Sequence, residues 1–138
     1  MSLSLSRKEY ILIMWIKFNP NPVNARVGDC AVRAIAKALD VNWEKAFVLI
    51  AKNGFEMGDI MASNNVWGSV LRQNGFYRHT LPTECPDCYT VRDFCFEHPK
   101  GVYVLGCANH VVTCEDGNYY DTWDSGDEVV IYYWSKGE

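Results

Sequence analysis

The sequence predicts an α+β domain, with helices in its first two thirds and strands in its last third. Between about residues 29 and 97, apolar residues recur with the 3.6-residue period of a helix. From residue 102 onward this period gives way to short runs rich in β-branched and aromatic residues. Because such an order favours segregated layers, we expect N-terminal helices packed on a C-terminal antiparallel sheet.

Four helices are predicted, each from an apolar stripe and from the residues at its ends. The first begins near Asp29, and its apolar face consists of Val32, Ile35, Ala36 and Leu39. Asn42 is suited to cap the second helix, which we expect to end just before Gly54. The third spans residues 63–74, with Gly75 as its stop, and a short fourth spans 91–97.

Four strands are predicted in the C-terminal third, at residues 102–105, 110–114, 119–123 and 129–134. The second and third are separated by Asp116-Gly117, a pair typical of a tight β-hairpin turn. This hairpin would place the start of the strand at 110–114 beside the end of the strand at 119–123. The two ends therefore become a place where side chains distant in sequence can meet.

Composition and charge narrow the class of protein. With 138 residues, 49% of them hydrophobic, the chain is long enough for one packed domain. A net charge of −4, without a basic patch interleaved with aromatics, argues against a nucleic-acid partner. The longest apolar run, residues 10–16, is too short to span a membrane and reads as a strand or as part of a leader. We therefore expect no membrane partner, and we take residues 1–14 as a leader or added segment.

The chain contains six cysteines, which we expect to be reduced because no secretion signal is evident. Cys107 and Cys114 flank His110 in the sequence and are expected to be buried thiols. Four further residues could together bind zinc, although their spacing matches no standard zinc finger: Cys85, Cys88, Cys95 and His98. We favour a turn with idle thiols there, and we predict no cofactor or metal for the protein.

One constellation of residues points to chemistry. Cys30 falls at the predicted start of the first helix, where free backbone N–H groups favour the reactive thiolate. His110 opens the strand that would lie across the hairpin from Asp121, so the acid can orient the imidazole as a base; Asp124 is the reserve. Asn24 precedes Cys30 by six residues and, with the Cys30 N–H, can form an oxyanion hole. The predicted catalytic set is therefore Cys30, His110, Asp121 and Asn24.

This pattern resembles the papain-like cysteine peptidases, and especially the compact bacterial branch that trims peptide leaders. In that superfamily an amide residue precedes the nucleophile by six positions, the Cys begins the main helix, and His and then Asn or Asp follow on adjacent strands. Asn24, Cys30, His110 and Asp121 match those positions in order, although the family usually has Gln where Asn24 stands. The chain also resembles small phage and gut-bacterial proteins in two runs, Gly-Asp-Cys-x-x-Arg-Ala at 28–34 and Tyr-Asp-Thr-Trp-Asp-Ser at 120–125.

The resemblance implies a single papain-like domain over residues 15–138 and a thiol hydrolase of amide bonds, that is, a cysteine peptidase acting on a peptide or protein. It implies a bacterial or phage-encoded protein, which we expect in the cytoplasm, with export left open. Two alternatives use the same fold: an acyltransferase or deamidase of transglutaminase type with the same triad, and a catalytically inactive binding module. Neither the substrate nor the oligomeric state follows from the sequence.

Overall fold

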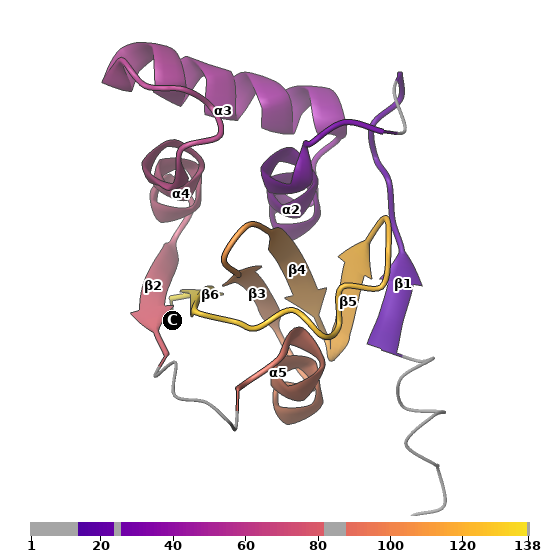
Figure 1. The fold of residues 1–138 in the computed structure, drawn as a ribbon. Helices are drawn as coiled ribbons and strands as arrows, with labels where there is room; N and C mark the ends of the chain where they lie inside the picture. Colours follow the sequence, from indigo (N-terminus) through magenta and orange to yellow (C-terminus); the bar gives the residue numbers. More distant parts are fainter. Residues whose placement is uncertain (1–13, 24–25, 82–87, 138) are drawn as a thin grey trace, which may run out of the picture.

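The structure, a computed structural model, describes residues 14–23, 26–81 and 88–137. It contains a six-stranded sheet and four described helices, so the predicted α+β class is confirmed (Figure 1). In chain order the elements are β1 Trp15–Lys17, α2 Cys30–Leu39, α3 Trp43–Met57, α4 Asn64–Gln73, β2 Phe76–Thr80, α5 Val91–Glu97, β3 Val102–Gly106, β4 Val111–Glu115, β5 Asn118–Asp121 and β6 Tyr132–Lys136. Within the described residues, no helix has the length and apolar character needed to cross a membrane.

The sheet has the strand order β1-β5-β4-β3-β6-β2, which corrects the expected all-antiparallel, C-terminal sheet. Its four central strands come from the C-terminal third and are antiparallel, as predicted. Both edges come from earlier in the chain: β2 pairs antiparallel with β6, whereas β1 pairs parallel with β5. Local sequence patterns do not specify such long-range pairing, which depends on packing across the whole domain.

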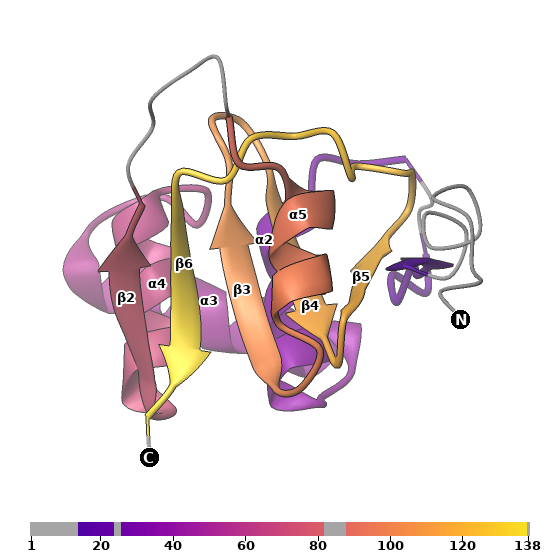
Figure 2. The same cartoon turned by 90° about the horizontal axis from the view of Figure 1, so that it is seen from below.

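Helices cover both faces of the sheet (Figures 1 and 2). On one face α2 lies against β4 and β3, and it also contacts α3 and α4. The core on this face includes Ile35 of α2 and Trp67 and Leu71 of α4. On the other face α5 covers a second core, in which Phe94 and Tyr119 are fully buried. The site described below lies on the first face, where α2 meets the sheet.

The predicted start of α3 agrees with the structure, and its predicted end is wrong. The Asn42 side chain accepts a hydrogen bond from the Lys45 N–H and so caps α3 as expected. However, α3 continues past Gly54 to Met57 and ends at Gly58, which has a left-handed φ of 70°. Gly54 is buried instead, and a Cβ there would lie 2.9 Å from the Asp59 carbonyl oxygen. Its small size serves helix packing rather than helix termination.

The β4–β5 hairpin forms at the predicted turn. Glu115 pairs with Asn118, and both Asp116 and Gly117 have positive φ angles, as a type I′ turn requires. The final strand, β6, begins at Tyr132 rather than at Val129, which instead makes an isolated bridge to Thr90.

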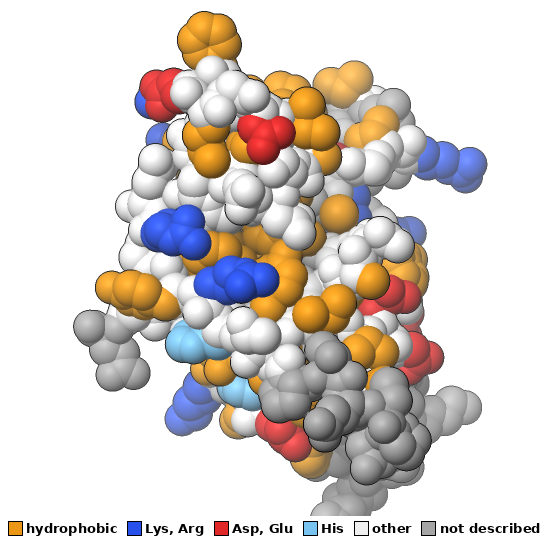
Figure 3. All heavy atoms as spheres, turned by 60° about the vertical axis from the view of Figure 1, so that its left-hand side comes forward, with side chains coloured by type: hydrophobic (Ala, Val, Ile, Leu, Met, Phe, Trp, Pro, Cys, Tyr) orange, Lys and Arg blue, Asp and Glu red, His pale blue; other side chains and the backbone are white. Residues whose placement is uncertain are grey.

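Cationic and imidazole side chains shield the β2 edge of the sheet. The Arg78 guanidinium lies 4.2 Å from the centre of the Tyr132 ring, and that of Arg72 lies 5.2 Å from Trp134. His79, an exposed residue of β2, stacks on Tyr133. Figure 3 shows Lys or Arg and His side chains beside hydrophobic ones on this side of the molecule. Charged groups of this kind discourage edge-to-edge pairing with other chains.

Candidate active site

Cys30 is the first residue of α2, and its side chain is half-buried. At this position its backbone N–H has no acceptor within the helix, and the helix dipole favours negative charge. The helix is held on the sheet by a buried hydrogen bond of 2.7 Å from Thr113 Oγ1 on β4 to the Ala34 carbonyl oxygen. The sulfur of Cys30 consequently lies beside the start of β4, where it interacts with the His110 side chain and the Val111 backbone.

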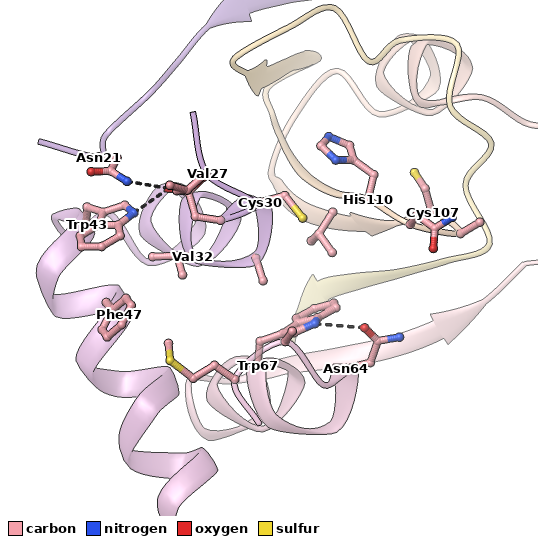
Figure 4. Close-up of a pocket in the computed structure, with 18 of the residues that line it drawn as sticks. Asn21, Val27, Cys30, Val32, Trp43, Phe47, Asn64, Trp67, Cys107 and His110 are labelled. Carbon is pink, nitrogen blue, oxygen red and sulfur yellow. Dashed lines mark hydrogen bonds between the residues drawn. The ribbon is translucent and has the colours of Figure 1, made fainter. Parts of the chain in front are cut away.

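His110 precedes β4, in a turn closed by the Cys107 N–H, which donates to the His110 carbonyl oxygen at 2.8 Å. Its Nε2 lies 2.5 Å from Asp121 Oδ2. Because Nε2 is engaged with the acid, Nδ1 is the nitrogen left for the bond with Cys30. Figure 4 shows Cys30 and His110 approaching the same space from the helix and from the sheet.

Trp123 covers the imidazole of His110. The centres of the two rings are 5.0 Å apart and their planes are inclined by 49°. The indole remains partly exposed, so it forms an outer screen between the imidazole and solvent. This screen helps to explain why only 10% of the His110 side chain is accessible.

Asp121 ends β5 and is 1% exposed. Its Oδ2 accepts the bond from His110 and another, of 2.6 Å, from the Ser125 hydroxyl. Its Oδ1 accepts from the Thr122 N–H at 2.8 Å and from the Arg33 guanidinium at 3.2 Å. Four donors therefore fix this carboxylate with one oxygen directed at His110.

Asp124, the reserve acid of the sequence analysis, lies elsewhere. Its carboxylate accepts hydrogen bonds from the Tyr119 hydroxyl and from the Gly126 N–H, the latter at 3.1 Å. It also forms an ion pair with Arg92 at 3.5 Å. The structure thus brings Asp121, not Asp124, to the imidazole.

Mutual contacts shift the pKa values of all three residues. Burial alone would raise the pKa of the Cys30 thiol, but the bonds to His110 and to the Val111 backbone, with the charges of His110 and Arg33, lower it. Burial alone would lower the pKa of His110, but bonds to Asp121 and Cys30 raise it to about 9. The pKa of Asp121 is lowered because its hydrogen bonds from His110 and Ser125 outweigh its burial. Each shift favours a charged thiolate–imidazolium–carboxylate chain.

Asn24, the predicted oxyanion donor, lies outside the described residues. Sequence reasoning overlooked the neighbours that organise the acid, namely Asp29, Arg33 and Ser125. Asp29 is the N-cap residue of α2 but makes no side-chain capping bond. Its carboxylate instead accepts from Arg33 on the same helix and from Trp43 Nε1 at 2.9 Å. The repeated acids and the arginine in the runs at 28–34 and 120–125 were the available signal.

A pocket of about 830 Å³ opens beside Cys30 and His110 (Figure 4). Its wall is mainly apolar and comes from α2, α3, α4 and the segments next to them; it includes Val27, Val32, Trp43, Phe47, Met61 and Trp67. The carboxylate in the wall, Asp29, is already satisfied by its side-chain donors. The cavity is therefore suited to an uncharged, apolar group held next to the thiol.

The other cysteines differ from Cys30. Cys95, Cys107 and Cys114 are buried free thiols, as was expected for Cys107 and Cys114. Burial, followed by the charges of Glu128 and Asp121, raises the pKa of Cys107 to about 12, which keeps this thiol protonated and inert.

The residues weighed for zinc do not assemble into a metal site within the described part of the chain. Cys88 is in a disulfide, which corrects the expectation that all six cysteines are reduced and that this turn holds idle thiols. The free thiols of Cys95 and Cys114 interact with each other rather than with a metal. The His98 ring stacks on Phe94, and its Nδ1 lies 2.8 Å from the Phe94 carbonyl oxygen. Cys85, the remaining candidate ligand, lies outside the described residues. Among residues 14–23, 26–81 and 88–137, no group of three or more His, Cys, Asp or Glu side chains could hold a metal ion.

Comparison with known proteins adds no relative: no protein family, no curated protein and no solved structure matches the chain.

Proposed function

We propose that the protein is a thiol hydrolase of amide bonds, a cysteine peptidase that uses Cys30, His110 and Asp121. The observation that carries the proposal is the line of side chains in which Cys30 at the start of α2 interacts with His110, while His110 Nε2 lies 2.5 Å from the carboxylate of Asp121, which is 1% exposed. An ordered nucleophile, base and orienting acid in one line are what thiol catalysis needs. A reactive Cys at the start of a helix, packed on the sheet that carries His and Asp, also supports a papain-like fold.

The geometry suggests how an amide would be cleaved. The Cys30 proton passes to His110 Nδ1, and the thiolate attacks the carbonyl carbon to form a tetrahedral adduct. The Cys30 N–H, free at the helix start, donates to the oxyanion; such a donor is worth about 3 kcal/mol in a well-aligned site. The imidazolium then gives its proton to the leaving amine as the carbon–nitrogen bond breaks. Water, deprotonated by His110, attacks the thioester and releases the acid and the thiol.

The pocket supports an apolar substrate. A bulky uncharged side chain next to the scissile carbonyl would contact Trp43, Phe47 and Trp67 while its carbonyl carbon lies near Cys30. A charged side chain would lose hydration there without gaining a partner, because Asp29 is already engaged by Arg33 and Trp43. We therefore expect a peptide substrate with an aromatic or branched aliphatic residue at this position.

The test begins with an activated ester whose aromatic side chain fits the apolar pocket. A p-nitrophenyl ester of an N-acylated phenylalanine should give a burst of p-nitrophenol equal to the enzyme concentration and an acyl adduct on Cys30 by mass spectrometry. Cys30→Ala and His110→Ala should abolish the burst, whereas His79→Ala, which removes an exposed imidazole on β2, should retain it. Hydrolysis of the matching peptide amide should follow the same pattern.

The fate of the acyl group separates the alternatives. Release to water, with added hydroxylamine competing only weakly, supports the hydrolase. Preferential formation of the hydroxamate would replace it with an acyltransferase, and ammonia released from a glutamine side chain, with the peptide bond intact, would replace it with a deamidase. Absence of a burst above that of Cys30→Ala would contradict catalysis and leave a binding module.

A further inference from the structure

Arg33 lies between two buried carboxylates that come from opposite ends of the site. It is on the first turns of α2, three residues after Cys30, and is only 7% exposed. One guanidinium nitrogen, Nη1, pairs with Asp29 Oδ1, and the other, Nη2, lies 3.2 Å from Asp121 Oδ1. Asp29 and Asp121 are 9% and 1% exposed, so neither carboxylate relies on water for compensation.

Arg33 and His110 bind different oxygens of the Asp121 carboxylate. Arg33 takes Oδ1 of Asp121, so Oδ2 remains for His110 and Ser125. Without that partner, the buried carboxylate would lose both a donor and the cation that compensates its charge, and it could rotate away from the imidazole. A planar guanidinium can contact two carboxylates at once in fixed geometry, whereas an ammonium cannot reproduce this fork.

The second carboxylate anchors Arg33 itself. Asp29 Oδ2 accepts bonds from Trp43 Nε1 at 2.9 Å and from Asn21 Nδ2 at 3.1 Å, two residues that line the pocket. These contacts are visible in Figure 4 as the dashed lines beside Asn21 and Trp43. One connected polar network therefore runs from Asn21 and Trp43 in the pocket wall to the imidazole of His110. It passes through Asp29, Arg33 and Asp121.

We infer that Arg33 is a positioning residue for the proposed thiol hydrolase, holding Asp121 in the orientation that lets His110 pair with Cys30. The inference rests on the proposed function and adds a residue to it. It also explains the two runs singled out in the sequence: Asp29, Cys30 and Arg33 belong to the first, Asp121 and Ser125 to the second, and the Arg33–Asp121 ion pair joins them.

The test is the pH dependence of Cys30 alkylation by iodoacetamide, followed by mass spectrometry, in Arg33→Lys and in the double variant Asp29→Asn, Arg33→Gln. The first keeps the charge but loses the fork. The second removes a carboxylate together with the guanidinium, so it avoids leaving a pair of uncompensated buried acids. Lys37→Gln is the matched control, because Lys37 lies one turn further along α2 and pairs at 3.3 Å with Glu115, away from the triad. Circular dichroism and thermal melting establish that each variant is folded.

In wild type we expect fast alkylation of Cys30 at acidic pH. In both Arg33 variants the rise of the rate should move to higher pH, with at least a tenfold loss of rate near pH 6, while Lys37→Gln follows wild type. A merely structural role for Arg33 would leave this profile unmoved in a folded variant, and that result would overturn the inference while leaving the proposed function intact. An ordinary thiol profile in wild type itself would overturn both.

Discussion

Replacement of Asp121 by Asn tests how the acid controls the imidazole. An amide that keeps its oxygen toward Arg33 and Thr122 must present its NH₂ group to Ser125 and His110. His110 Nε2 would then have to accept a hydrogen bond, which moves the ring proton to Nδ1, facing Cys30. The opposite amide orientation sets NH₂ against two donors, the Arg33 guanidinium and the Thr122 N–H. Either orientation disfavours the imidazolium.

The magnitude follows from the pKa of His110, which its partners raise from 6.5 to about 9. A shift of that size corresponds to roughly 3 kcal/mol of preference for the charged ring. Asp121 and Cys30 share it, and the hydrogen bond with Asp121 makes the largest contribution that raises the pKa of His110. If the acid supplies about half or more, the pKa of His110 in Asp121→Asn should fall by about one pH unit or more.

The assay is NMR titration of the His110 C2–H resonance, assigned by comparison with His110→Ala. Asp124→Asn is the matched control, since it removes a carboxylate three residues away that contacts Tyr119 and Gly126 rather than His110. An unchanged His110 pKa in Asp121→Asn, or an equal fall in Asp124→Asn, would refute the reasoning.

Two further predictions concern the pocket and the sheet. Phe47 lies at a partly exposed position of the pocket wall. Phe47→Asp should raise KM about tenfold for a substrate with an aromatic residue, because apolar contact is lost, and should leave kcat nearly unchanged. An equal rise in KM for the matching alanine substrate would contradict the assigned pocket. Gly106→Ala should destabilise the fold by about 2 kcal/mol in urea unfolding, because its Cβ would lie 2.2 Å from Tyr132 Cζ. Gly28→Ala, where a Cβ meets nothing within 4 Å, is the control, and equal unfolding midpoints for the two variants would argue against this packing.

The parts of the fold that local sequence specifies were predicted well. Asn42 caps a helix through its own side chain, α5 spans the expected residues 91–97, and Asp116-Gly117 forms the expected turn. Each of these signals acts within a few residues, so pattern and chemistry suffice. The prediction that α3 ends before Gly54 was wrong because the sequence alone does not distinguish a glycine buried within a helix from one that ends it. The close approach of the Asp59 backbone, which requires a small residue at position 54, is seen only in the structure.

The long-range features required the three-dimensional structure. The parallel pairing of β1 with β5 joins residues about a hundred positions apart, with no local signal for it. Pairing Cys30 with His110 and Asp121 was predictable because a helix start and a hairpin constrain where those side chains lie. The bridge from Arg33 to Asp121 spans 88 positions, and Arg33 looked like an ordinary polar residue on an amphipathic helix.

The most direct test of the central claim is the rate of alkylation of Cys30 by iodoacetamide between about pH 4 and 9, measured beside His110→Ala. An ordinary thiol, with a pKa near 8.5, is only about 0.3% thiolate at pH 6, so a Cys30 paired with imidazolium should react about 10- to 100-fold faster there. We predict that Cys30 alone among the free cysteines shows this acidic reactivity and that His110→Ala removes it. A Cys30 that reacts as an ordinary thiol, or whose reactivity is indifferent to His110, would contradict the account.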